Sequence, residues 1–188
     1  MNWEDIVYDP GSTTKAFKYL TDNYTLEILF SGFDGELFKR TIVIKLDDIP
    51  VMIATSETKV SNDLFLDILQ NAQTTPIGVK LFSPKLGIKR GDMIVTQRNI
   101  AAIDDILISN YMKALGMDKE FYFRTSTFTY DTQTMELKEY ILPGLELIIN
   151  KYNSCHSRGL CHSRAGWNLC KRELVKENIC SVFCQSPH

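Results

Sequence analysis

The residue types best suited to metal binding and thiol chemistry are confined to the end of this chain. All five cysteines and all three histidines of the 188 residues follow residue 153. Cys155, Cys161 and Cys170 are irregularly spaced and lack the C-x₂-C pair of a zinc knuckle, while Cys180 and Cys184 form only a C-x₃-C pair. We therefore expect no metal. A zinc site and a redox or partner-binding tail remain alternatives to a segment without function.

The first 153 residues contain neither cysteine nor histidine, which restricts the chemistry of this part. A Cys/His zinc site, a cysteine nucleophile or a histidine general base cannot form there. Any catalysis would have to use carboxylates, lysines, tyrosines, hydroxyls or backbone groups. We predict a folded domain over 1–152 and a Cys/His-containing extension over 153–188 that is disordered or accessory.

The charge distribution argues against a nucleic-acid partner. The net charge is −2, and from Lys151 onward six basic residues face two acidic ones, so the preceding body is acidic and a poor binder of phosphate backbones. No apolar run approaches the ~18 residues of a membrane helix, and the acidic start MNWEDIVYDPG is not a signal peptide. We expect a cytoplasmic protein without a membrane partner, as a monomer or small homo-oligomer.

The apolar patterns predict an antiparallel α+β domain. Strands come in pairs joined by short polar turns rather than alternating with helices, which favours hairpins. The expected strands cover 24–33, 37–46, 51–60, 121–130 and 134–142. The expected helices cover 12–22, 63–71, 100–117 and 144–152.

The last predicted strand carries a glutamate on its apolar face. In TMELKEYILPG, Leu137 and Ile141 share a face with Glu139, so this carboxylate points inward and must be paired, hydrogen-bonded or neutralised. A two-residue loop at 131–132 would set Arg124 directly opposite Glu139, whereas a three-residue loop would turn Arg124 to the other face. Such a pair is either purely structural or part of a polar cavity within the sheet.

The order of several short motifs resembles the chorismate lyase family. The similar segments, in chain order, are GSTTKAF at 11–17, LDDIPVMIATS at 46–56, TTPIGVKLFS at 74–83 and KEYILP at 138–143. The resemblance covers about residues 11–145. It implies an antiparallel sheet of about six strands, with helices covering one face and flap segments enclosing the ligand.

The same resemblance implies a lyase that eliminates pyruvate from chorismate to give 4-hydroxybenzoate, without metal or organic cofactor. Glu139 would be the catalytic carboxylate. Thr13, Ile77 and Gly78 would contact the small-molecule substrate, and so would Thr55, which stands where well-studied members place an arginine that holds the ligand carboxylate. A substitute cation is then needed, and we expect it to be Arg124.

Two other functions remain open at this point. One is a noncatalytic domain that binds a small aromatic or sugar-like ligand in the same cavity, because relatives of the family include ligand-sensing domains of bacterial transcription regulators. The other is a catalytically decayed paralogue, which would suit Thr55 and also Val79, at a second position where the family has arginine. Turnover distinguishes the enzyme from both.

Overall fold

The structure is a computed structural model that describes residues 2–118 and 120–157. The chain divides into two compact units, residues 2–145 and the segment from Glu146 onward, and each is described by itself. The first unit contains the helices α1 (Trp3–Val7), α2 (Thr13–Leu20), α3 (Asp63–Gln70), α4 (Gly78–Leu81), η1 (Ile100–Ala102, a 3-10 helix) and α5 (Ile106–Ala114). Its strands are β1 (Tyr24–Asp34), β2 (Leu37–Leu46), β3 (Ile49–Lys59), β4 (Lys89–Arg90), β5 (Ile94–Arg98), β6 (Phe121–Tyr130) and β7 (Gln133–Ile141).

Helix α6 (Gly144–Ser157) begins at the end of the first unit and continues into the second. It starts where the sequence predicts a helix and runs beyond the expected end at residue 152. Most of the Cys/His extension lies outside the described residues, so its expected disorder or accessory role stays a prediction.

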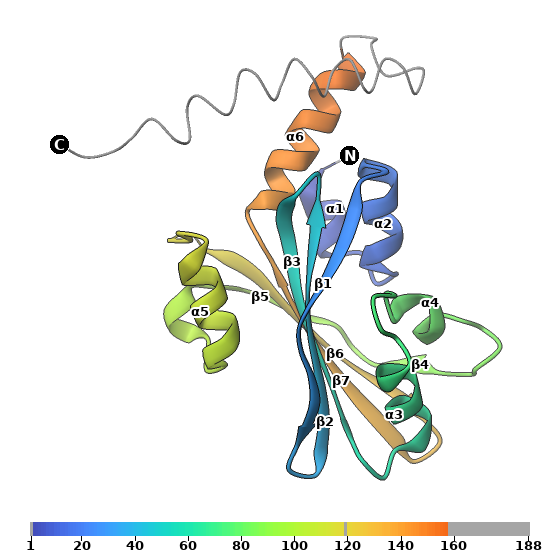
Figure 1. Cartoon of the computed structure of the whole chain (residues 1–188). Helices are drawn as coiled ribbons and strands as arrows, with labels where there is room; N and C mark the ends of the chain where they lie inside the picture. The colour runs from blue at the N-terminus through green and yellow to red at the C-terminus, as the bar shows by residue number, and fades with distance from the viewer. Residues whose placement is uncertain (1, 119, 158–188) are drawn as a thin grey trace. The chain divides into compact units, whose positions relative to one another are not determined.

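The strands of the described residues form one antiparallel sheet in the order β1-β2-β3-β7-β6-β4, and β5 pairs with another stretch of β6 (Figure 1). The turns explain the antiparallel hairpins. Asp47 and Asp48, between β2 and β3, have φ angles of 49° and 65°, as a two-residue type I′ turn requires. Gly35 takes a φ of 59° in the turn between β1 and β2. The predicted α+β class with an antiparallel sheet is confirmed.

The sheet is covered on both faces, by different helices. Residues of α2 and α4 close over one face, which carries Glu139. On the other face, Ile108 and Met112 of α5 pack with Val43 and Ile53 in a fully buried cluster. Figure 1 shows α5 on the opposite side of the sheet from α3 and α4. The sequence predicted helices on one face of the sheet only. The structure has a second, smaller core on the other face, beneath α5.

The helix predicted over 100–117 is interrupted in the structure. Residues 100–102 form η1, and α5 begins only at Ile106. The reason is Asp105, whose side chain accepts a hydrogen bond from the Ile108 backbone at 3.2 Å and so caps a new helix start. The helix ends at Ala114, three residues before the expected end, and Gly116 takes a φ of 65° just beyond it.

No helix of the described residues is long and apolar enough to cross a membrane. Within residues 2–118 and 120–157, no three His, Cys, Asp or Glu side chains are grouped closely enough to hold a metal ion.

Candidate functional site

Glu139 is buried and paired with Arg124 across the β6–β7 hairpin. The loop between these strands holds the two residues Asp131 and Thr132, and the register sets Arg124 directly opposite Glu139. The guanidinium binds the carboxylate through two contacts, Nε to Oε2 at 2.7 Å and Nη2 to Oε1 at 2.8 Å. The arginine is 1% exposed and the glutamate 4%. The pairing predicted from the two-residue loop is confirmed.

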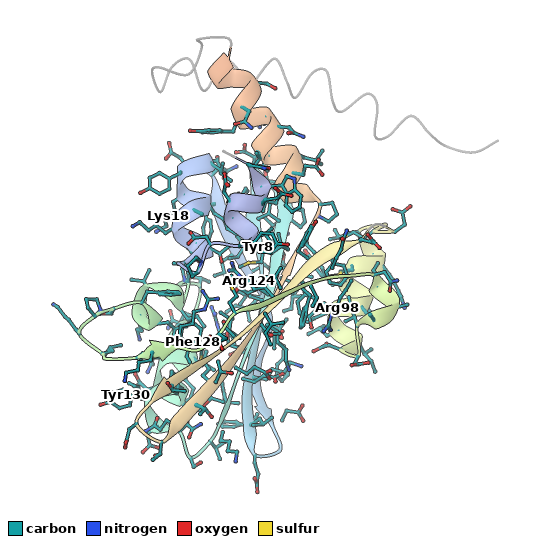
Figure 2. The ribbon with its side chains drawn as sticks, turned by 180° about the vertical axis from the view of Figure 1, so that it is seen from behind. Tyr8, Lys18, Arg98, Arg124, Phe128 and Tyr130 are labelled. Carbon is teal, nitrogen blue, oxygen red and sulfur yellow. The ribbon has the colours of Figure 1, made fainter. Side chains whose placement is uncertain are left out.

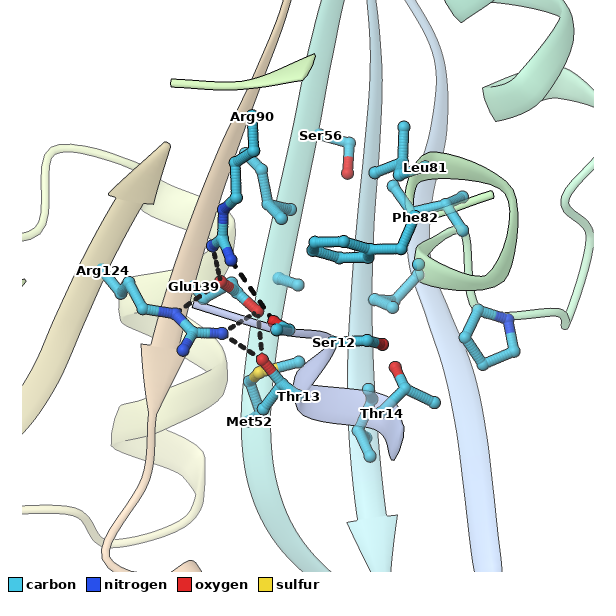
Figure 3. Close-up of a pocket in the computed structure, with 18 residues that line it drawn as sticks. Ser12, Thr13, Thr14, Met52, Ser56, Leu81, Phe82, Arg90, Arg124 and Glu139 are labelled. Carbon is cyan, nitrogen blue, oxygen red and sulfur yellow. Dashed lines mark hydrogen bonds and ion pairs between the residues drawn. The ribbon is translucent and has the colours of Figure 1, made fainter. Parts of the chain in front are cut away.

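Arg124 also holds the N-terminal segment of the chain. Its Nη1 donates to the carbonyl oxygens of Ile6, Val7 and Asp9 at 3.3, 3.2 and 3.1 Å. Its Nη2 also donates to Thr13 Oγ1. The Thr13 hydroxyl in turn donates to Oε1 of the glutamate at 3.0 Å. One buried guanidinium thus fixes the start of α2 and the segment before it against the sheet (Figure 3).

A second arginine, Arg90 of β4, completes this cluster and was not among the residues singled out from the sequence. Its Nη2 lies 3.6 Å from Oε2 of Glu139, and its Nη1 donates to the carbonyl oxygens of Pro10 and Gly11 at 2.5 and 3.3 Å. Figure 3 shows Arg90 and Arg124 approaching Glu139 from two sides. Burial lowers the pKa of Arg90, Glu139 raises it and Arg124 lowers it, and a guanidinium stays protonated in proteins.

The aromatic rings beside Arg90 help to hold it in place. Its guanidinium carbon lies 5.6 Å from the ring centroid of Phe82 and 5.5 Å from that of Phe128, distances at which a cation is attracted to a ring. Phe128 is fully buried, so this contact is shielded from water. The position of Arg90 is therefore set by strand pairing, backbone carbonyls and aromatic contacts together.

The cluster carries an excess of positive charge and of hydrogen-bond donors. Two guanidinium groups share the single carboxylate of Glu139. Among the described residues, neither Arg90 Nε nor Ser126 Oγ has a hydrogen-bond partner, although both atoms are buried. A buried donor without a partner costs about 1–3 kcal/mol. Of these two atoms, Arg90 Nε belongs to a residue that lines the neighbouring cavity, where it could donate to an oxygen atom of an anionic group.

The cavity beside this cluster, here called the arginine cavity, has a volume of about 40 Å³. Its polar end is formed by Arg90, Arg124 and Glu139. The remainder is lined by residues 11–14, 76–78 and 81–82 and by the sheet residues Ile42, Ile44, Met52, Ala54, Ser56 and Leu137. The two covering segments touch, since a Cβ on Gly78 would lie 2.8 Å from Ser12 Oγ.

The structure brings together five of the six residues predicted for the site. Thr13, Ile77, Gly78, Arg124 and Glu139 all line the arginine cavity. The sixth residue, Thr55, is buried on the opposite face of the sheet, where its hydroxyl lies 3.2 Å from that of Thr41. Its neighbours on β3, Ala54 and Ser56, face the cavity instead, and neither is charged.

A third arginine, Arg40 of β2, anchors the segment that leads into α4. It is 1% exposed, and its Nη2 donates to the carbonyl oxygens of Gln73 and Thr75 at 2.6 and 3.4 Å. Burial lowers the pKa of Arg40, while the nearby Tyr24 acts against that shift. This contact fixes the chain just before residues 76–82, which cover the cavity.

Stability at alkaline pH is expected to depend on Tyr24. Burial raises the pKa of Tyr24 to about 12 from 10.0, while Thr14 and Arg40 act to lower it. Between these two values the folded chain keeps a proton that the unfolded chain has released. The free energy of unfolding should therefore fall as the pH rises, by at most about 1.4 kcal/mol per pH unit from this group.

Urea titrations of the wild-type protein and of Tyr24→Phe at about pH 9 and about pH 11 measure this contribution. Between these two pH values the free energy of unfolding should fall less in the variant than in the wild-type protein. The other tyrosines are the same in both proteins, so their contributions cancel in the comparison. Equal losses in the two proteins would show that the Tyr24 hydroxyl titrates alike in the folded and unfolded chains.

The fold and the cluster define the class: an antiparallel α+β domain with a buried, arginine-rich cavity under α2 and α4. Neither a protein-family model nor a curated protein matches this sequence. Solved structures match at the level of the fold.

The fold is similar to that of several solved structures. PhnF from Mycobacterium smegmatis has 12% sequence identity and a TM-score of 0.51, and the match covers 72% of this chain and 65% of that chain. The effector domain of PhnF, with 13% identity, covers 71% of this chain and 89% of its own, at a TM-score of 0.48. The ligand-binding domain of a putative GntR-family transcriptional regulator from Bordetella bronchiseptica has 13% sequence identity and a TM-score of 0.43. The match covers 65% of this chain and 87% of that chain. At such identities the likeness shows the fold alone.

Proposed function

We propose that this chain is a noncatalytic domain that binds a small anionic ligand in the arginine cavity. The observation that carries the proposal is the charge balance of the cavity, in which the two buried arginines Arg90 and Arg124 face the single carboxylate of Glu139. Among the charged residues that line the cavity, one positive charge is left without a carboxylate, while Asp9 acts on Arg90 from outside the lining. Arg90 Nε is also a buried donor without a described partner. A carboxylate or phosphate group on a ligand would supply both the missing charge and the missing acceptor.

The contacts of Glu139 favour binding over elimination. A general acid or base needs a carboxylate oxygen within hydrogen-bonding reach of the substrate atom that exchanges the proton. Here Oε1 already accepts from Arg124 and Thr13, and Oε2 accepts from Arg124 and lies near Arg90. In a binding domain, Glu139 would orient the two guanidinium groups, and the ligand would bind to Arg90. Elimination of pyruvate from chorismate is thus the weaker proposal.

Ligand binding requires the covering segments to move. The arginine cavity of about 40 Å³ is far smaller than the ~300–1,000 Å³ of typical small-molecule sites. The start of α2 and residues 76–82 form its cover. The chain just before each segment is held by arginine contacts to the backbone carbonyls of Asp9, Pro10 and Gln73. An anionic ligand at Arg90 would compete with the carbonyls of Pro10 and Gly11 and favour the open form.

The test combines turnover and binding on the full chain. Chorismate is incubated with the protein and the products are followed by chromatography, while calorimetry measures binding of chorismate, 4-hydroxybenzoate and inorganic phosphate. We expect at least one of these anions to bind and to be recovered unchanged. The neutral 4-hydroxybenzamide is the matched control for 4-hydroxybenzoate and should not bind.

Formation of pyruvate and 4-hydroxybenzoate, abolished in Glu139→Gln, would replace this proposal by the lyase function. Equal binding of the benzoate and the benzamide would show that the positive charge of the cavity does not select the ligand. No binding of any of the three anions would also contradict the proposal.

A further inference from the structure

A second and larger cavity lies on the opposite face of the sheet, beside the N-terminal end of α5. Its volume is about 320 Å³, which reaches the size of small-molecule sites. Its buried wall is formed by Thr55, Phe123 and Tyr140, with 1%, 7% and 7% exposure. The two rings pack together with centroids 4.9 Å apart. In an otherwise polar lining, the cavity therefore has two aromatic rings that a hydrocarbon group could contact.

Most of the charged side chains of this cavity neutralise one another. Lys39 binds Asp105 at 2.5 Å and lies 3.6 Å from Glu57. Lys138 binds the other oxygen of Glu57 at 3.1 Å. These groups tie β2, β3 and β7 to the cap of α5, and Lys39, Glu57 and Asp105 are each about four-fifths buried. They form a rigid polar border and leave little free charge.

Two charged residues of the cavity differ from the others. Within the described part of the chain, Arg98 and Asp104 have no ion pair, although both line this cavity. The Arg98 guanidinium carbon lies 3.9 Å from the ring centroid of Phe123, and its Nε donates to Thr96 Oγ1 at 3.3 Å. These contacts orient the cation, as a binding group requires. Figure 2 shows that Arg98 lies on the side of the sheet near α5, whereas Arg124 lies near α1 and α2.

We infer that this cavity is a binding site for a small zwitterion of the amino-acid class, with an apolar side chain. The ligand carboxylate would pair with Arg98, its ammonium with Asp104, and its side chain with the Phe123–Tyr140 wall. Within the lining, cations and carboxylates are equal in number, which suits an overall neutral ligand: Lys39, Arg98 and Lys138 against Glu57, Asp104 and Asp105. Glu136, outside the lining, also pairs with Lys138 at 3.0 Å. The site is separated from the arginine cavity by the sheet and does not depend on the function proposed for that cavity.

The test measures binding of L-leucine and L-phenylalanine to the full chain by calorimetry. Two matched compounds each remove one charge from phenylalanine: 3-phenylpropanoate lacks the ammonium group, and 2-phenylethylamine lacks the carboxylate. We expect at least one amino acid to bind, and each matched compound to bind more than about tenfold more weakly than phenylalanine when phenylalanine is the ligand.

Two variants assign the charges. Arg98→Gln should weaken amino-acid binding by more than about tenfold and remove the preference for phenylalanine over 2-phenylethylamine. Asp104→Asn should weaken binding similarly and remove the preference over 3-phenylpropanoate. Lys85→Gln and Asp92→Asn change exposed charges outside both cavities and serve as controls that should bind normally.

Each remaining outcome would overturn the inference. The site would be refuted if neither amino acid bound, or if binding survived in both Arg98→Gln and Asp104→Asn. Tighter binding of 3-phenylpropanoate or of 2-phenylethylamine than of phenylalanine would show an anion or a cation site instead of a zwitterion site.

Discussion

Replacing Arg124 by methionine is expected to lower the free energy of unfolding by about 3–5 kcal/mol. Methionine fills much of the same volume but leaves the Glu139 carboxylate without the partner that contacts both of its oxygens. It also removes the Nη1 group that donates hydrogen bonds to the carbonyl oxygens of Ile6, Val7 and Asp9. Urea unfolding at neutral pH, followed by circular dichroism, measures the loss.

A double variant separates the charge effect from the packing effect. In Arg124→Met/Glu139→Leu both charges are absent, and a buried pair replaced by apolar residues often costs little. We expect the double variant to be more stable than Arg124→Met. The unpaired carbonyls of residues 6–9 and the loss of the Arg90–Glu139 contact keep it below the wild-type protein. If the double variant is no more stable than Arg124→Met, the lost stability comes from packing and backbone contacts rather than from the buried, unpaired carboxylate of Glu139.

Replacing Arg90 by glutamine is expected to weaken binding of an anionic ligand by about thirtyfold or more, which corresponds to about 2 kcal/mol. Arg90 supplies the positive charge that Glu139 does not neutralise, because Arg124 already binds that carboxylate through two contacts. Glutamine keeps hydrogen-bond donors at this position but removes the charge. Calorimetry with the anion that binds the wild-type protein gives the ratio.

The neighbouring variant Lys89→Gln is the matched control. It removes the same charge from an exposed residue of the same short strand, outside the arginine cavity. Its affinity should equal that of the wild-type protein. Similar losses in Lys89→Gln and Arg90→Gln would mean that general electrostatic attraction, rather than a contact in the cavity, governs binding.

The core of the site could be predicted because it depends on local rules. Alternation along 135–141 places Glu139 on the apolar face, and a two-residue loop then fixes which residue of the preceding strand stands opposite. Both steps involve only one hairpin. The same locality explains why the hairpins, the helix over 63–71 and the antiparallel α+β class followed from the apolar pattern and the turns.

Thr55 shows where this reasoning fails. Residues 51–56 are buried on both faces of the sheet, so the strand has no alternation of apolar and polar residues from which a face could be assigned. Similarity of motifs pointed to position 55, but the register sets Ala54 opposite Glu139 and turns Thr55 toward the second cavity. A shift of one residue along a strand reverses the face of every side chain.

The sequence by itself determined the sheet class and the inward face of Glu139, because both follow from alternation and turns that are a few residues long. It gave the pair with Arg124 only on the condition of a two-residue loop, which the structure has. Only the tertiary structure decided the charge of the cavity. Arg90 lies on a two-residue strand without any pattern, and it reaches Glu139 only because β4 pairs with the edge of β6 opposite Phe128 and Thr129. Such pairing depends on contacts between segments far apart in the chain, and no local rule encodes them. The two cavities on opposite faces arise in the same way, from how helices and loops close over a sheet.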